Sequence, residues 1–502
     1  MKKTEFILFF FTFVIFGSKD SKAQVYGSNT VEIQYGNLPF EDKNFGSSYD
    51  QVNLFYDHNN LSFYGRVEYF LTPYEDRNYQ DLTQKRIQYR DDTFRIRLGN
   101  FYETIGRGLL LRSYDIPGSV YEDEFERTRY SFFRDLEGIA VDATTSWLEV
   151  KALHAKPLFN ILPPNFKPDT LRRPDLVEAI QANVFLSEKI SIGGAFMRSY
   201  PNFSNATSEY GSFMFSSTPI QNISFFGEYA FETDAQVLAF QKEDAYALYL
   251  GSNFYIDSFG GSIEYKNYNN FRLGQGYNDP PSLIKEHTYP VLNRSTHVLE
   301  TSNETGFQFE TYYNFEEGHA ITANFTTAKN DLFREFNYME FFLEGYYEVD
   351  DFLSIKTFFD YADDEPKSEE NRISVGLITD KSFNYEWGLN LDLQYQTFER
   401  SFDPDPSSNY YGAITFTYLP DISAGIVFEA STDPQQTDNP NTFAVETETR
   451  TWLGTNFSYR FSSSNRIDVF AGKRRGGPAC TSGICYEILD FEGVEVRFST
   501  RF

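Results

Sequence analysis

The chain has 502 residues, of which 41% are hydrophobic, 18% aromatic and 23% charged, and its formal net charge at pH 7 is −28. The many aromatic residues exclude a disordered chain, and the lack of any apolar run of about 18 residues excludes a bundle of membrane-spanning helices. The negative charge argues against nucleic acid as a partner, because a surface that binds nucleic acid is basic. With 2 Cys and 5 His, the chain has few ligands for a metal centre, and we expect no cofactor.

The first residues have the order of a secretory signal peptide. Lys2 and Lys3 precede an apolar run over residues 6–16, and Ser21-Lys22-Ala23 supplies a cleavage site with small residues. The apolar run is too short to span a bilayer. The sequence therefore predicts a protein exported by the Sec route, with a signal peptide at 1–23 and a single domain at 24–502.

From residue 24 onward, one segment after another alternates apolar and polar residues with a period of two. The clearest is 385–396, where Trp387, Leu389 and Leu391 share one face and Asn390 and Asp392 share the other. Similar alternation occurs at 61–69, 94–98, 353–361, 373–377, 412–418 and 422–428. This pattern is typical of strands in a sheet with one apolar and one polar face.

The connections between these segments favour a membrane barrel over a soluble sandwich or a secreted solenoid. Short turns, such as 57–60 and 257–258, alternate with long connections at about 155–177, 268–303, 398–408 and 432–449. To keep this order, we expect an additional strand at 107–114. The fold class is then all-β: one transmembrane antiparallel up-and-down β-barrel of about 22–24 strands, with short periplasmic turns and long extracellular loops. The expected location is the cell outer membrane, in contact with its lipid and lipopolysaccharide.

The final strand adds a resemblance to known barrels. Over residues 493–502, Phe498 and Phe502 fall on the apolar face, and this ending resembles the C-terminal targeting strand of outer-membrane barrels. The resemblance implies that the barrel-assembly machinery reads Phe498 and Phe502. Residues 98–108, Asp279-Pro280-Pro281 and the final loop with its two cysteines are also similar to a family of uncharacterised outer-membrane barrels. That resemblance implies the fold and no particular activity.

Charged residues on the polar faces are the candidates for the lumen. They are Arg66, Glu68, Arg95, Arg97, Glu340, Glu344, Lys356, Asp360, Arg497 and Arg501. Because both signs occur close together, ion pairs across neighbouring strands are the simpler interpretation, and a ladder that selects a solute is the alternative. If the last strand closes the barrel beside the first, Arg497 should lie near Glu32 or Gln34.

The connections carry three further predictions. The segment 268–303 is unusually apolar for a long loop, so we expect it to fold into the barrel mouth and narrow it, with a surface flap as the alternative. Cys480 and Cys485 lie in a Gly-rich and Pro-containing loop, which favours a local disulfide over a redox pair or a metal site. Acidic clusters at 121–124, 363–365 and 369–370 are expected to hydrate the outer surface, or to hold divalent cations that bridge lipopolysaccharide.

No enzymatic motif supports catalysis. The sequence has no Gly-x-Ser-x-Gly, no His-Glu-x-x-His and no Walker loop, although a hydrolase with His154 or His319 beside a serine of the wall is an alternative. We expect a porin-like barrel, not an enzyme, that passes or binds an unidentified small solute. An accessory barrel of an assembly or secretion complex is the other hypothesis.

Overall fold

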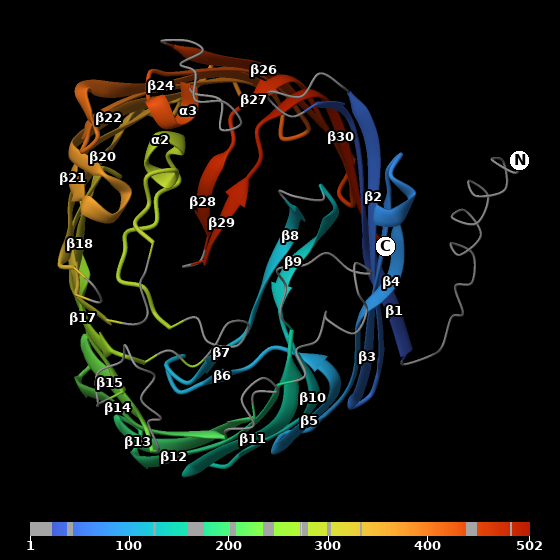
Figure 1. Ribbon diagram of the computed structural model, residues 1–502, viewed down its shortest axis with the longest axis vertical. Helices are drawn as coiled ribbons and strands as arrows, with labels where there is room; N and C mark the ends of the chain where they lie inside the picture. Colours follow the sequence, from blue (N-terminus) through green and yellow to red (C-terminus); the bar gives the residue numbers. More distant parts are fainter. Residues whose placement is uncertain are drawn as a thin grey trace, which may run out of the picture.

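The wall of the molecule is one antiparallel sheet of 24 strands that closes on itself (Figure 1). The computed structural model describes residues 23–37, 44–123, 127–158, 175–200, 207–233, 245–271, 273, 280–298, 303–331, 334–437, 449–481 and 484–502. The predicted signal peptide lies outside these residues, except for Ala23, where the first strand begins. The closed sheet confirms the predicted fold class.

Each wall strand pairs with the next one along the chain, and the last pairs with the first. The strands are β1 (Ala23–Asn37), β2 (Phe45–His58), β3 (Leu61–Leu71), β4 (Tyr79–Arg90), β5 (Phe94–Phe101), β10 (Leu136–Thr144), β11 (Leu148–Pro157), β12 (Leu176–Ser187), β13 (Ile190–Tyr200), β14 (Ser208–Ile220), β15 (Ile223–Glu232), β16 (Tyr246–Ile256), β17 (Phe259–Asn269), β18 (Asn303–Asn314), β19 (Ala320–Asn330), β20 (Phe336–Asp350), β21 (Leu353–Asp364), β22 (Glu369–Ser382), β23 (Trp387–Arg400), β24 (Asp403–Tyr418), β25 (Ile422–Ser431), β26 (Arg450–Ser462), β27 (Asn465–Arg474) and β30 (Phe491–Arg501).

Closure of the sheet matters because lipid cannot satisfy the hydrogen bonds of an open strand edge. The seam between β1 and β30 runs in register from Ser28 opposite Arg501 to Asn37 opposite Glu492. Large apolar side chains such as Ile373, Val375 and Leu377 project outward, each at least 40% exposed in the isolated chain. This exposed apolar surface suits hydrocarbon rather than water. Within the described residues, no helix is long and apolar enough to cross a bilayer.

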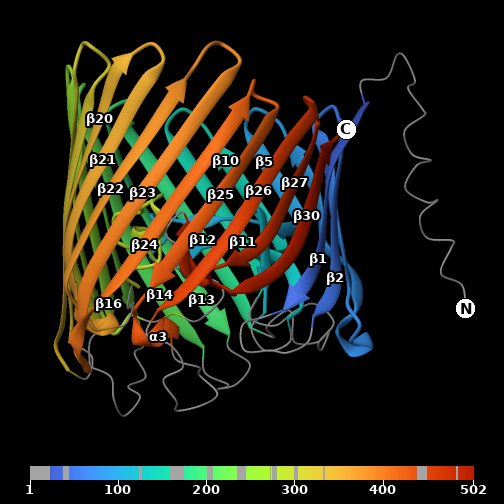
Figure 2. The same ribbon diagram turned by 90° about the horizontal axis from the view of Figure 1, so that it is seen from above.

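The short turns gather at one end of the barrel and the long connections at the other, as Figure 2 shows. We call these the turn end and the loop end. The prediction of a long connection at 398–408 is wrong. β23 and β24 extend through this segment and leave only residues 401–402 between them. Their residues continue the ladder from Phe398 opposite Ser407 to Arg400 opposite Asp403, so polar composition there did not mean an irregular loop.

The additional wall strand expected at 107–114 is also wrong. β5 pairs directly with β10, from Phe101 opposite Leu136 to Phe94 opposite Ala143. The residues between them leave the wall and form two small hairpins, β6 (Thr104–Ile105) with β7 (Leu111–Arg112) and β8 (Tyr114–Glu122) with β9 (Arg129–Arg134). The alternation of short and long connections holds without the added strand, because this excursion is itself a long connection.

Three segments enter the barrel from the loop end (Figure 1). We call the described residues of 102–135 the first insert, residues 280–298 the second insert, and the described residues of 475–490 the third insert. The second insert contains the short helix α2 (Pro290–Asn293), and the third contains the hairpin of β28 (Gly477–Thr481) and β29 (Ile484–Ile488). The remaining short elements are η1 (Glu75–Arg77), η2 (Glu365–Lys367) and α3 (Pro434–Thr437).

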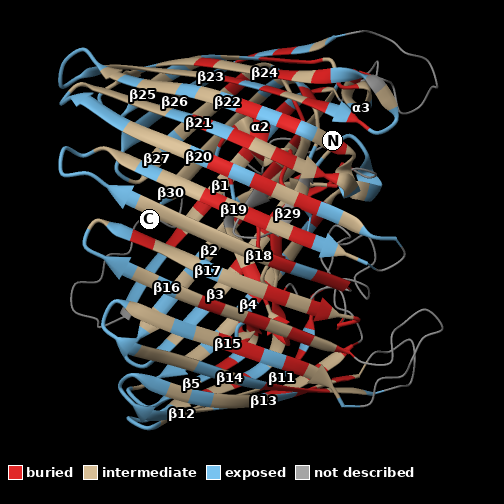
Figure 3. Cartoon of the chain, turned by 90° about the vertical axis from the view of Figure 1, so that its left-hand side faces the viewer, coloured by how far each residue is buried: buried red, intermediate tan, exposed pale blue. Residues whose placement is uncertain are grey.

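Burial is uneven along the barrel. Figure 3 shows buried residues concentrated toward the loop end and exposed residues at the turn end. The inserts occupy the same half as the buried residues, so they convert part of a polar lumen into a packed interior.

Candidate functional site

The first insert carries an apolar core into the lumen. Leu109, Leu110 and Leu111 are fully buried and pack in one cluster with small and aromatic inward residues of β10 to β17. Gly106 turns the chain with φ +65°, a conformation that favours glycine, and the oxygens of Glu228 stand where its Cβ would be. The Glu228 carboxylate accepts a hydrogen bond from the backbone N–H of Arg107 at 2.6 Å. The leucines within the predicted strand at 107–114 therefore form a core in the lumen.

The hairpin of β8 and β9 is fastened to the wall by arginines. Arg66 of β3 donates to the Ser131 hydroxyl at 3.0 Å and lies 3.4 Å from a carboxylate oxygen of Asp115. Arg129 of β9 lies 2.5 Å from a Glu32 oxygen and 3.6 Å from a Glu495 oxygen. Since Glu32 belongs to β1 and Glu495 to β30, this one guanidinium spans the seam of the barrel.

The second insert is tied to the opposite wall by charged contacts. The Arg294 guanidinium meets the Glu429 carboxylate through two hydrogen bonds of 2.5 and 2.9 Å. Lys285 pairs with Glu310 at 2.5 Å, and Tyr289 donates to Glu344. The described part of the predicted mouth loop thus lies inside the barrel and not on its surface.

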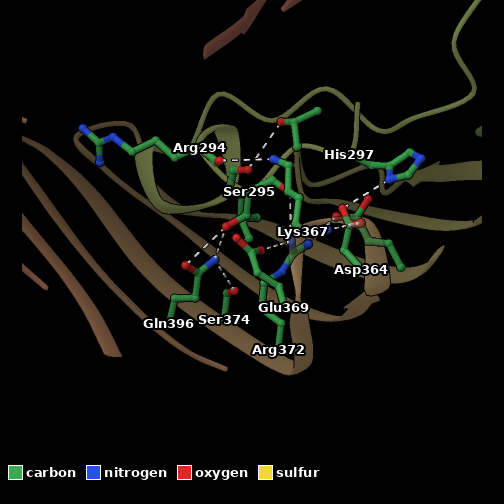
Figure 4. Close-up of polar contacts among 12 residues, drawn as sticks. Arg294, Ser295, His297, Asp364, Lys367, Glu369, Arg372, Ser374 and Gln396 are labelled. Atoms are coloured by element: carbon green, nitrogen blue, oxygen red, sulfur yellow. Dashed lines mark hydrogen bonds and ion pairs between the residues drawn. The ribbon is translucent and has the colours of Figure 1, made fainter. Parts of the chain in front are cut away.

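Arg372 is the centre of the most buried polar network, part of which Figure 4 shows. Its side chain is 1% exposed and reaches three carboxylates, Glu340 at 3.0 Å, Asp360 at 3.2 Å and Glu369 at 3.1 Å. It also donates to the Ser295 carbonyl of the second insert at 2.9 Å. Arg372, a residue of the wall, thereby binds the backbone of the second insert.

Three potential metal ligands meet in this network: His287, Glu340 and Asp360 offer atoms within 4.8 Å of one another. The His287 ring nitrogen lies 3.2 Å from Glu340. Arg372 hydrogen-bonds to both carboxylates, so a cationic side chain already lies against this group. The donor set fits an ion-pair network that locks the insert in place.

His297 adds a titratable contact to the second insert. Its Nδ1 lies 3.2 Å from an Asp364 oxygen, and its Nε2 lies 3.7 Å from Glu304. Burial disfavours the imidazolium, but the hydrogen bonds and charges of Asp364 and Glu304 outweigh burial and raise the pKa of His297. Glu304 also pairs with the buried Lys266 of the wall.

The remaining lumen candidates range from fully buried to exposed. Arg97 pairs with Asp142 at 2.7 Å and with Glu103 of the first insert, and Arg95 pairs with Asp142 at 2.8 Å. Glu68 accepts a hydrogen bond from the Ser131 backbone at 3.4 Å, and the Arg497 guanidinium lies 2.7 Å from a Glu32 oxygen. Lys356 is partly exposed on the same face of its strand as Asp360. Arg501 is exposed at the turn end. Arg497 lies opposite Glu32, where closure of the barrel would put it.

Of the predicted assembly residues, Phe498 lies in the seam strand β30 and Phe502 follows the last residue of that strand. Phe498 pairs with Val31 of β1 and with Ile467 of β27, and its ring stacks on Phe461 at 6.0 Å between centroids. Phe502 is 57% exposed, and its carbonyl accepts a hydrogen bond from the Gly27 backbone at 2.8 Å. Both residues stay predicted assembly signals.

Each of the three acidic clusters contains a carboxylate that pairs inside the barrel instead of forming the hydrated surface we expected. Asp364 and Glu369 are buried, and they bind His297 and Arg372 respectively. Glu122, from the cluster at 121–124, pairs with Arg127 and Arg129. These carboxylates serve the inserts. Composition alone does not reveal this role, because it depends on the inserts folding into the lumen, and the partner of Asp364 lies 67 residues away in the chain.

The alternative of a hydrolase finds no support in the contacts of the two histidines. His154 lies 2.9 Å from Glu178 on a largely exposed face. His319 stacks on Tyr347 and accepts a hydrogen bond from the Glu348 backbone. Neither contact is with a serine, which the proposed nucleophile would be.

Two cavities lie among the inserts. One of about 360 Å³ separates the first insert from the second and is lined by Arg107, Arg112, Tyr249 and Glu286, among others. The other, of about 350 Å³, lies between the second and third inserts, η2 and α3. Sequence analysis missed Arg129, Arg372 and Arg475 as lumen residues. The run Lys473-Arg474-Arg475, unusual in so acidic a chain, was a signal for the last of them.

A closed antiparallel barrel with an apolar outer belt and a polar, partly filled lumen defines the protein as an outer-membrane β-barrel. Residues 189–362 match the model of DUF6029, a family of unknown function. No curated protein matches the chain.

Several solved structures from Pseudomonas aeruginosa are similar in fold. OccK3 (OpdO) is 11% identical with TM-score 0.42, over 68% of this chain and 90% of that chain. The outer membrane protein OprD is 11% identical with TM-score 0.40, over 68% and 88%. OccK5 (OpdH) is 11% identical with TM-score 0.41, over 79% and 98%. At this identity the likeness concerns the barrel fold alone.

Proposed function

We propose that the protein is a porin-like channel of the outer membrane in which the three inserts narrow the path of a small solute. The observation that carries this proposal is the second insert, which is held inside the loop end by Arg294, His287 and His297 rather than lying over the mouth. A barrel of 24 strands is wide enough to enclose water, and a folded insert restricts what passes.

The residues that line the lumen favour passage of a solute over a purely structural barrel with a closed lumen. Its inward face keeps charged groups toward the turn end, where Lys356 and Arg501 remain accessible. Charged residues of both signs around a constriction are the elements from which pores select solutes. The accessory barrel proposed from the sequence needs no such lining, and no contact among the described residues favours it.

The test is single-channel conductance of the refolded protein in planar bilayers. Deleting residues 275–295 should raise the conductance, because it removes most of the second insert, with Arg294 and His287, while the wall strands β17 and β18 remain. Heat-modifiable mobility on gels should show that the deletion variant still closes. A folded deletion variant with unchanged conductance would contradict the narrowing. A protein that never conducts but copurifies with stable partners would favour the accessory role.

A further inference from the structure

The cavity of about 350 Å³ at the loop end has an unusual charge balance. Four cationic side chains line it, Arg294, Lys367, Arg400 and Arg475, but only two carboxylates, Glu369 and Asp433. They come from the second insert, η2, the wall and the third insert, so the cavity exists only when all of these are assembled. Its size falls at the small end of ligand pockets, which span about 300–1,000 Å³.

The carboxylates around the cavity already have guanidinium partners. Arg400 holds Asp433 through two bonds of 3.1 and 2.6 Å, and Arg294 holds Glu429 in the same way. Glu369 accepts from Arg372 at 3.1 Å. These pairs account for two of the four cations that line the cavity.

The other two cations bind only neutral oxygens among the described residues. Arg475 donates to the Asn409 side-chain oxygen at 3.2 Å, and Lys367 donates to the Arg294 backbone carbonyl at 3.4 Å. Arg475 is 6% exposed, and its Nε is buried without a hydrogen bond. A buried charge without a direct ion pair is costly, so such a group favours an anion placed against it.

Electrostatics agree with this geometry. Burial and the nearby positive charge of Arg294 lower the pKa of Arg475 to about 10, although Glu429, Asp433 and Asp490 oppose that shift. Burial likewise lowers the pKa of Lys367, despite Glu369 and Asp364. Both cations would gain from an anion placed in the cavity.

We propose that this cavity is a binding site for a small solute that carries an oxyanion, a carboxylate or a phosphate, held by Arg475 and Lys367. The planar guanidinium fork matches either group, and the Lys367 ammonium adds a second charge. Ser295, Ser368, Gln435 and Gln436 also line the cavity, and these polar residues suit a polar solute. The site rests on the proposed function only in that the solute must reach the lumen.

Trp452 supplies a direct readout. Its ring is 4% exposed, and the Arg475 guanidinium carbon lies 5.3 Å from the ring centroid, whereas the other two tryptophans, Trp147 and Trp387, are largely exposed. We would titrate the detergent-solubilised protein with inorganic phosphate and with succinate, using chloride at matched ionic strength as the reference. A saturable change in fluorescence is expected for at least one oxyanion, and it should vanish in Trp452→Phe.

The variants separate a site from general attraction of anions. Arg475→Gln should weaken binding by about tenfold or more, as expected for loss of charged hydrogen bonds. Lys367→Gln should weaken it less, and it serves as the test if Arg475→Gln does not fold. Lys473→Gln is the matched control, because Lys473 pairs with Glu492 outside the cavity and should leave binding unchanged.

Two results would overturn the site: chloride giving the same response as both oxyanions, or the Arg475 and Lys367 variants binding like the parent. Binding by both phosphate and succinate supports recognition of the oxyanion group itself, and binding by one identifies the class. Because binding is measured without ion flow, saturable binding by a barrel that never conducts contradicts the proposed passage and leaves the site standing.

Discussion

The loop-end and turn-end halves of the barrel use the same wall strands differently. In β23, the inward side chains Gln394, Gln396 and Arg400 near the loop end are at most 6% exposed, whereas Asn390 and Asp392 nearer the turns are partly exposed. The outward face of the same strand does not change in this way, since Trp387 is 49% exposed and Leu393 46%. Burial in the lumen therefore comes from the inserts and not from the wall.

The two halves differ in which inward charged residues need an ion-pair partner. An inward charge facing water is solvated and tolerates change, but an inward charge covered by an insert must be paired. The dense ion pairs of the loop-end half follow from this requirement.

Removing the central loop-end cation should be the most damaging change. Arg372→Met leaves Glu340 and Asp360 buried without their counter-charge, which should lower the free energy of unfolding by about 3–5 kcal/mol. Denaturant unfolding of the refolded barrel measures the loss. Lys356→Met, an inward cation that is partly exposed, is the control and should change stability by about 0.5 kcal/mol or less. Equal costs for the two variants would erase the difference between the halves.

The orientation of the wall gives the next largest effect. Leu391→Arg should cost about 2–4 kcal/mol, because the side chain faces lipid near the middle of β23. Asn390→Arg, one residue away on the lumen face, should cost little. The same unfolding assay compares them, and the reverse ranking would refute the assigned facing.

The attachment of the second insert should depend on pH through His297. Because its folded-state pKa is raised, the stabilisation is fully present below the unfolded value of about 6.5 and is lost as pH rises through the folded value. Loss of a charged hydrogen bond corresponds to about 1.5–3 kcal/mol. Limited proteolysis within 280–298 at increasing pH should detect the loosening. His297→Gln should flatten this dependence, and a variant that keeps the parent's pH profile would assign the effect to another group.

The smallest effect concerns the third insert. The hairpin register places Cys480 opposite Cys485, and directly opposed residues have the Cα spacing that a disulfide requires. We propose that they form a bridge in the exported protein, which for so short a loop is worth about 2 kcal/mol or less. A thiol assay of the denatured protein should find reactive cysteine only after reduction. Two free thiols before reduction would exclude the bridge.

How far the sequence predicts this molecule depends on what each pattern encodes. Alternation over 385–396 predicted both the strand and its facing, because lipid on one side and a polar lumen on the other leave a period of two. The contact of Arg497 with Glu32 was also within reach, since closing an up-and-down barrel sets the last strand beside the first.

The positions of the first and third inserts in the lumen could not be predicted from alternation. The apolar run at Leu109–Leu111 has the composition of a lipid-facing strand, and only its packing inside the barrel separates the two structures. Arg372 acquires its role from a residue of a distant insert, Ser295, so no local pattern distinguishes it from a solvated arginine. The segment 268–303 was the exception, because its apolar content is unusual for an exposed connection.

Arg129 links two events that are usually considered separately. It bridges carboxylates of the first and the last wall strand while belonging to a hairpin in the lumen. Pairing of β1 with β30 and packing of the β8–β9 hairpin in the lumen therefore stabilise one another. A nascent molecule that sealed around empty space would leave Glu32 with one cationic neighbour, Arg497, instead of two. We expect the β8–β9 hairpin to be folded in the lumen when β1 pairs with β30. Packing of the lumen is then a step of barrel assembly and does not follow it.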